Sequence, residues 1–134
     1  MKLKCERVAR FGVVGGTGFL VDAGVLMVLL SMGWANPYIA RCFSFPPAVL
    51  VTWLLNRCFV FESHADSLRA KGREYGRYFA VQFLGVLINF AVYSVCIFLF
   101  SFFRDWPILA LAAGSGVAMV FNFIGAGYWV FRKP

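Results

Sequence analysis

The sequence predicts an all-α membrane protein with four transmembrane helices, and its composition is the first reason. The chain of 134 residues is 61% hydrophobic and 14% charged, with a mean hydropathy of +0.76. Ordinary soluble domains are less apolar and carry more charge on their surface. The second reason is that the apolar residues form four long stretches, at about 11–31, 38–56, 78–101 and 107–131. Each is long enough to cross a hydrocarbon core of about 30 Å, so residues 1–134 form a single transmembrane domain.

A weak internal duplication is the third observation. Arg10-Phe11 opens an apolar run that carries Asp22 twelve residues after the arginine, and Arg77-Tyr78 opens a second run that carries Asn89 at the same spacing. In each half, a short polar break then leads to another apolar segment. Because each copy contains two spans, both copies have the same orientation, and we expect two parallel two-helix repeats. Repeats with polar groups at matching depth are typical of membrane transport proteins.

The distribution of Lys and Arg predicts the orientation of the chain. All but two of the 13 lie before the first span, between the second and third spans, or after the fourth. Arg41 and Arg104 are the exceptions. Positive residues gather on the cytoplasmic side of membrane proteins, so we expect cytoplasmic N and C termini in the cytoplasmic (inner) membrane. The net charge of +7 is a topology signal, and we expect no nucleic-acid partner.

The first two spans are joined by a short turn at 33–37, which predicts an antiparallel hairpin. Gly12 and Gly16 in the first span form a G-x-x-x-G pair, which permits close approach of another helix in lipid. Pro46-Pro47 removes two amide donors from the second span. We therefore expect a kink or local unwinding there.

The third and fourth spans are also joined by a tight turn, at 102–107, and form a second hairpin. The loop before them, about 57–76, mixes charges of both signs. Its later part, 67–78, fits a basic amphipathic helix that lies on the inner membrane surface.

Polar side chains inside the spans are candidate ligand-binding residues. Asp22 lies about 18 Å beyond Arg10 along a helix, near the middle of the bilayer. A carboxylate at that depth faces a wet cavity or the bundle interior, so Asp22 has either a functional role or a structural one, bonded to Asn89 or to a hydroxyl. Arg41, at the outer start of the second span, either snorkels outward or reaches Asp22 or a ligand phosphate.

A second group of candidates lies at the inner interface. Asn56-Arg57 ends the second span, and Arg77 starts the third at the same level. Arginine binds phosphate bidentately, which fits an anionic headgroup; the alternative for Arg77 is ordinary interfacial anchoring. Together with an asparagine in the fourth span, the ligand-binding candidates are Asp22, Arg41, Asn56, Arg57, Arg77, Asn89 and Asn122.

Patterns of catalytic chemistry are missing from the sequence. The chain contains one histidine, no C-x-x-C pair among its four cysteines, and no Ser-His-Asp set or paired carboxylates. We therefore expect no enzyme activity, no metal site and no cofactor.

Several motifs resemble the GtrA-like family of small four-span membrane proteins. Residues 10–22 resemble the opening signature of that family, residues 54–61 resemble its second-span ending, and Asn122 with residues 129–131 resembles its fourth-span ending. The resemblance extends from about Arg10 to Phe131. One departure is that such proteins often repeat an Asn-Arg pair at the end of the fourth span, where this chain has Ala126-Gly127. The second half is therefore expected to contribute less to phosphate binding.

The resemblance implies a role in moving polyprenyl-phosphate-linked sugars across the cytoplasmic membrane for cell-surface polysaccharide synthesis. The leading hypothesis is a lipid-linked sugar flippase whose partners are the polyprenyl-phosphate sugar and membrane lipids. The alternatives are a non-transporting scaffold for a glycosyltransferase, which docks on the central loop, and a small cation or drug exporter that uses Asp22. Four spans enclose little volume, so we expect a homodimer or higher oligomer.

Overall fold

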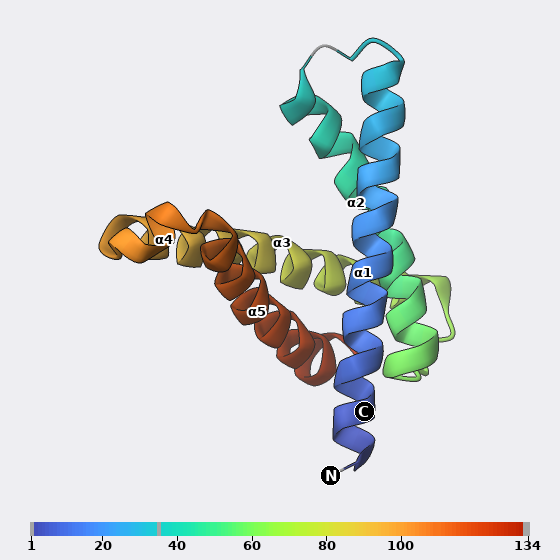
Figure 1. Cartoon of the computed structure of the whole chain (residues 1–134). Helices are drawn as coiled ribbons and strands as arrows, with labels where there is room; N and C mark the ends of the chain where they lie inside the picture. The colour runs from blue at the N-terminus through green and yellow to red at the C-terminus, as the bar shows by residue number, and fades with distance from the viewer. Residues whose placement is uncertain (1, 35, 133–134) are drawn as a thin grey trace.

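The computed structural model describes residues 2–34 and 36–132, without the side chains of residues 2–4, 37, 38, 41, 107 and 108. All of its described secondary structure is helical (Figure 1). The α-helices are α1 (Lys2–Ser31), α2 (Pro37–Leu55), α3 (Leu68–Leu99), the short α4 (Ser101–Asp105) and α5 (Pro107–Gly125). Two π-helices, η1 (Asn56–Val60) and η2 (Ala126–Val130), continue α2 and α5.

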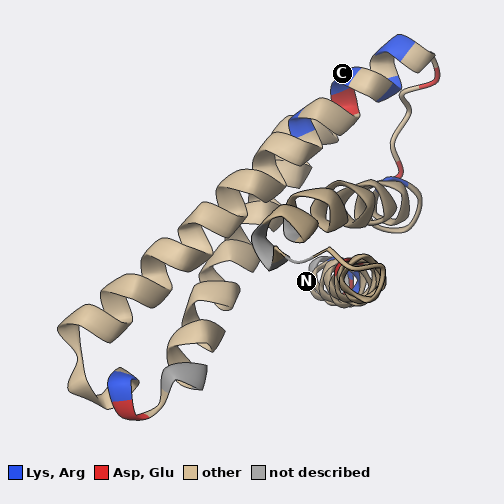
Figure 2. Ribbon diagram, turned by 90° about the horizontal axis from the view of Figure 1, so that it is seen from above, with Lys and Arg blue, Asp and Glu red and all other residues tan. Residues whose placement is uncertain are grey.

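Four helical segments are long and apolar enough to cross a membrane, which confirms the four predicted spans. They are Cys5–Ser31, Cys42–Val60, Leu68–Leu99 and Leu109–Val130. Figure 2 shows long uncharged stretches on α3 and α5, with charges gathered near their ends. Apolar side chains such as Phe98 and Phe90 are largely exposed, as expected for a surface that faces lipid. The chain is a multi-pass membrane protein.

The expectation of a separate surface helix at 67–78 is wrong. These residues form the first turns of α3, which starts after Ser67, whose hydroxyl accepts a hydrogen bond from the Ala70 amide at 3.1 Å. Glu74 and Tyr78 on this segment are buried against the first half of the chain. Their contacts hold the segment in line with the span, where an amphipathic pattern alone favours a position flat on the membrane.

The expected unwinding at Pro46-Pro47 does not occur, because α2 is helical from Pro37 to Leu55. The hydrogen-bonding pattern changes later, in η1, where the Phe61 amide donates to the Asn56 carbonyl at 2.9 Å. The same change occurs in η2, where the Phe131 amide donates to the Ala126 carbonyl at 2.8 Å. The wider turn lets the first and last residues of each π-helix and the phenylalanine that follows it face the core together, and all six are buried.

Helix α1 packs along α2, and α3 packs along α5, so the chain forms two hairpins. Their internal contacts correspond. A Cβ added to Gly18 would lie 2.3 Å from Thr52 Cγ2, and one added to Gly85 would lie 2.2 Å from Asn122 Oδ1. Gly18 thus corresponds to Gly85, and Thr52 to Asn122. The two hairpins thus make similar close contacts at two pairs of positions that the sequence duplication relates.

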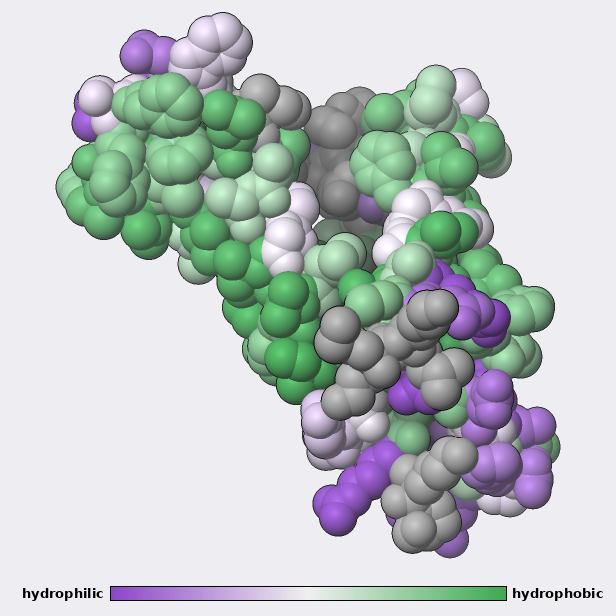
Figure 3. All heavy atoms as spheres, turned by 60° about the horizontal axis from the view of Figure 1, so that its bottom comes forward, coloured by the Kyte–Doolittle hydropathy of each residue, from purple (hydrophilic) through white to green (hydrophobic). Residues whose placement is uncertain are grey.

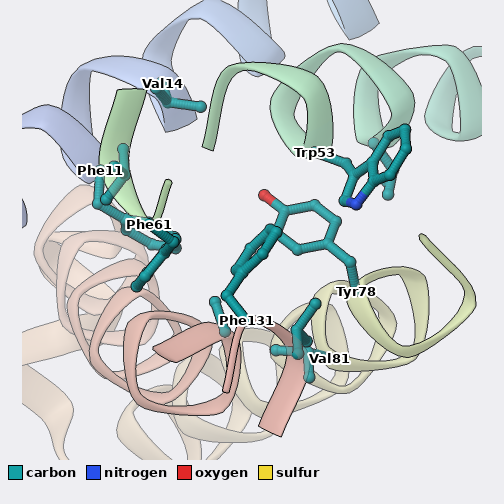
Figure 4. Close-up of a cluster of buried hydrophobic side chains, with 11 residues drawn as sticks. Phe11, Val14, Trp53, Phe61, Tyr78, Val81 and Phe131 are labelled. Carbon is teal, nitrogen blue, oxygen red and sulfur yellow. The ribbon is translucent and has the colours of Figure 1, made fainter. Parts of the chain in front are cut away.

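The two hairpins cross near one end and diverge from there, so that two apolar lobes stand apart above a hydrophilic end (Figures 1 and 3). Buried side chains from both hairpins form the core at the crossing, and Figure 4 shows that they converge. The rings of Phe61 and Phe131, which follow η1 and η2, stack with centroids 4.8 Å apart. Such an aromatic pair contributes about 0.5–1.5 kcal/mol beyond its buried area. The core therefore joins the hairpins at one end only.

Candidate functional site

A cavity of about 450 Å³ lies where the two hairpins cross, and it is the candidate site. Its volume is within the range of small-molecule pockets. All four spans contribute to its wall. The polar side chains that line it are Asp22, Thr52, Asn56, Tyr78, Gln82, Asn89, Ser115 and Asn122. The structure thus brings four of the seven predicted site residues together.

Asp22 lies on α1 and is 7% exposed. Its Oδ1 accepts a hydrogen bond of 2.5 Å from the hydroxyl of Ser44, which is fully buried in α2. If Asp22 has a structural role, we expect it to bond to Asn89 or to a hydroxyl, and Ser44 provides such a hydroxyl. The residue also lines the cavity, so the bond orients a carboxylate that is part of the cavity wall.

Asn89 and Asn122 connect the helices of the second hairpin. The Asn89 amide donates to the Ser115 hydroxyl at 3.2 Å, and the Asn122 amide donates to Gln82 Oε1 at 3.1 Å. Interhelical hydrogen bonds of this kind are typical of membrane helices. They hold both asparagines in the wall of the cavity.

Asn56 connects the two hairpins. Its side-chain amide donates to the Tyr78 hydroxyl at 2.7 Å, and both residues are 1% exposed. Among the described residues, the Oδ1 atoms of Asn56 and Asn122 are buried without a hydrogen-bond donor. Buried oxygens without a donor are uncommon and call for an explanation. Both residues line the cavity, but each of these oxygens is enclosed by neighbouring protein atoms, so a donor reaches it only if the helices move apart.

Arg57 lies outside the cavity and is already paired with Glu74. Its guanidinium contacts Glu74 Oε1 at 2.8 Å and the Ser63 hydroxyl at 3.1 Å, and it also donates to the Ala65 carbonyl. The Trp53 indole donates to the same Glu74 oxygen at 3.0 Å. Arg57 therefore joins η1 of the first hairpin to α3 of the second.

Sequence reasoning missed Glu74 and Tyr78. The available signal was helical spacing, because residues four apart share one face of a helix. Both residues therefore point from α3 toward the first hairpin. The mixed charges around Glu74 hid this signal, since such a segment resembles a solvated loop.

Arg77 does not line the cavity. Arg77 is exposed, and its guanidinium lies 5.9 Å from the centre of the Trp129 ring. This position fits the interfacial-anchoring interpretation. Arg41 lies in α2, but its side chain is outside the described part of the structure.

The G-x-x-x-G pair does not bring two helices of this chain together. A Cβ added to Gly12 or Gly16 would meet nothing within 4 Å, and both glycines line the cavity. The expectation of close helix packing at these residues is wrong within the chain. Close approach occurs instead at Gly18, Gly85 and Gly114. The glycines at 12 and 16 add no side chains of their own to the cavity wall, and open space lies beside them.

We expect the Tyr78→Phe variant to lose about 1–2 kcal/mol of stability, because the fully buried Asn56 then keeps no hydrogen bond on its side chain. In the internal duplication, Phe11 corresponds to Tyr78, and Ala126 corresponds to Asn56. The double variant Tyr78→Phe/Asn56→Ala copies that apolar pair and should recover part of the loss. Thermal unfolding in detergent measures both variants. A double variant less stable than Tyr78→Phe would contradict the argument.

Within the described residues, no group of three or more His, Cys, Asp and Glu side chains gathers at one point. The four cysteines are free. The fold and the cavity thus define a small four-span membrane protein with a polar chamber between two helical hairpins.

Comparison with known families agrees with this class. The family model described as GtrA/DPMS, transmembrane domain, matches residues 10–131, and the chain belongs to this family. The match covers nearly the same residues as the resemblance seen in the sequence. The domain is that of a membrane protein in glycoconjugate synthesis.

Proposed function

We propose that this protein moves a polyprenyl-phosphate-linked sugar across the cytoplasmic membrane for cell-surface polysaccharide synthesis. The observation that carries the proposal is the set of polar side chains from all four spans, Asp22, Asn56, Asn89 and Asn122 among them, in the wall of a cavity at the hairpin crossing. Sugars present several hydroxyl donors. Membership of the GtrA/DPMS family supports the same class of substrate.

The cavity suits the headgroup, and the lipid-facing surface suits the tail. Sugar hydroxyls would bond to polar side chains of the cavity wall, among them the carboxylate of Asp22, replacing the hydrogen bonds that the sugar makes with water. This replacement lowers the cost of bringing a polar group into the membrane. The side of the cavity lined by Gly12 and Gly16 has open space, so the polyprenyl chain can leave the headgroup there and remain in lipid.

We place the hydrophilic end of the molecule in the cytoplasm, because Lys and Arg concentrate in the segments that meet there. The hairpins diverge and leave wide apolar faces between them, which supports assembly of two or more chains around a closed path. The protein then acts by binding and conformational change, without bond chemistry.

Translocation by the purified protein in liposomes tests this function. We expect Asp22→Ala to slow movement of a polyprenyl-phosphate sugar at least about tenfold, equivalent to ~1.4 kcal/mol, because the cavity loses its carboxylate. The matched control is Asp105→Ala, which removes an exposed carboxylate on α4 outside the cavity. It should keep the wild-type rate.

Two results would contradict the proposal. Folded wild-type protein that moves no lipid-linked sugar, alone in liposomes, would favour the glycosyltransferase scaffold. In that case neutral replacements of the exposed Arg69 and Arg73 on α3 should abolish partner co-purification, and Asp22→Ala should not. Equal rates for the wild type and Asp22→Ala would instead remove this cavity from the path.

A further inference from the structure

We propose that Arg7 on α1 and Arg132 after η2 form a site for the phosphate group of the lipid carrier, between the two hairpins at the hydrophilic end of the molecule. This inference rests on the proposed function for the identity of the carrier. Arg7 and Arg132 line a cavity of about 620 Å³, together with Glu62, Gly127 and Tyr128. The cavity is separate from the candidate sugar site. The two are divided by the ring pair of Phe11, which lines the sugar site, and Phe61, which lines this cavity, with centroids 6.1 Å apart.

The internal duplication allows one half of the molecule to be compared with the other. The Phe11–Phe61 pair at 6.1 Å corresponds to the Tyr78–Phe131 pair at 5.9 Å. Arg7 precedes Phe11 by four residues, as Glu74 precedes Tyr78.

Gly127 follows Ala126 at the start of η2, as Arg57 follows Asn56 at the start of η1. The place of the Arg57–Glu74 ion pair is therefore taken by Gly127 and Arg7. Both Gly127 and Arg7 line the 620 Å³ cavity, which agrees with this correspondence.

The net charge differs between these two equivalent places at the hairpin crossing. Arg57 and Glu74 neutralise each other and fill their interface. At the equivalent place Gly127 has no side chain and Arg7 is a cation. Neither Arg7 nor Arg132 forms a hydrogen bond or ion pair with any residue that the structure describes. Two guanidinium groups without partners therefore border an open space.

Phosphate matches this arrangement better than other anions. A guanidinium binds two phosphate oxygens at once, and two arginines bind one phosphate from different sides. The site lies beside the sugar cavity, at the hydrophilic end where a headgroup phosphate remains near water. Glu62 lines the same cavity and opposes the anion. Its carboxylate repels the phosphate. Neutralising Glu62 should therefore strengthen phosphate binding, whereas neutralising Arg7 should weaken it.

Binding of farnesyl phosphate to the full chain in detergent, measured by calorimetry, tests the site. We expect Arg7→Gln to weaken binding about tenfold, as loss of a charge-assisted hydrogen bond implies, and Glu62→Gln to strengthen it. Arg69→Gln, the matched control, removes an exposed charge on α3 and should change nothing. The double variant Arg7→Glu/Gly127→Arg copies the Arg57–Glu74 ion pair at the equivalent place and should close the site.

Further ligands distinguish the sources of the phosphate. Farnesol should not bind. Stronger binding of farnesyl phosphate than of phosphatidic acid or inorganic phosphate supports the polyprenyl carrier, whereas equal binding of all three phosphates would overturn that assignment. Equal affinity of wild type and Arg7→Gln for farnesyl phosphate would overturn the site itself.

The experiments distinguish a failure of the phosphate site from a failure of the proposed translocation function. If Arg7→Gln weakens binding but the wild type moves no lipid in liposomes, only the translocation function fails. If the wild type moves lipid and Arg7→Gln neither weakens binding nor slows movement at low lipid concentration, only the phosphate site fails.

Discussion

Replacement of Arg57 by leucine is expected to destabilise the protein by about 3–5 kcal/mol, because it leaves Glu74 as an unpaired buried charge. The Glu74 side chain is 7% exposed, and Arg57 supplies its 2.8 Å ion-pair contact. The Trp53 and Ser63 hydrogen bonds to Glu74 remain in the variant and compensate only in part. Thermal or denaturant unfolding in detergent measures the loss.

The control for this prediction removes both charges. Replacing a buried ion pair by apolar residues is often close to neutral, whereas removing one partner is not. Arg57→Leu/Glu74→Leu should therefore be clearly more stable than Arg57→Leu alone. Arg77→Leu removes an exposed cation from the same end of the molecule and should have a small effect. If Arg57→Leu has the stability of Arg77→Leu, the ion pair does not join the hairpins.

Replacement of Gly114 by valine is the second large effect that we expect. A Cβ at Gly114 would lie 2.7 Å from the backbone carbonyl oxygen of Asn89 and 2.6 Å from its Oδ1. Because the backbone of α3 cannot move aside as a side chain can, α5 has to move away from α3. We expect the free energy of unfolding to fall by about 3 kcal/mol, the upper end of the usual cost of overpacking a core. Unfolding in detergent measures this change.

Gly116 offers a matched control on the same helix. A Cβ added there would meet nothing within 4 Å, so Gly116→Val should leave stability nearly unchanged. Gly114→Val should also lower translocation, because it displaces Asn89 and Ser115 in the cavity wall. Equal stability of the two valine variants would show that α3 and α5 do not pack closely at Gly114.

Much of the candidate site could be predicted from single residues. Asp22, Asn56, Asn89 and Asn122 are polar residues within apolar spans, and the cost of burying them in lipid is itself a sign that they face a cavity or a partner. All four line the same cavity. Gln82 is also polar within a span, and we expect such a residue to bond between helices, as Gln82 does with Asn122. The partners Ser44 and Tyr78 have no such sign, since these residue types occur at many places in membrane helices.

The role of Arg57 shows where sequence reasoning reached its limit. An arginine at the inner end of a span is equally suited to a ligand phosphate, to lipid headgroups or to a carboxylate of the protein. Its chemistry is the same in each case. Only the position of Glu74, brought beside it by the crossing of the hairpins, decides among them. The inference that Arg7 faces an open cavity depends on the same crossing.

The amino-acid sequence by itself determined that this is a four-span membrane protein with two related halves and polar groups at matching depth. Those properties follow from transfer of each segment into lipid, which depends on the residues of that segment alone. Tertiary structure decided where the hairpins cross, that η1 and η2 bring Phe61 and Phe131 together, and which arginine is paired. These features depend on contacts between distant segments, and lipid as a solvent does not favour one helix packing over another.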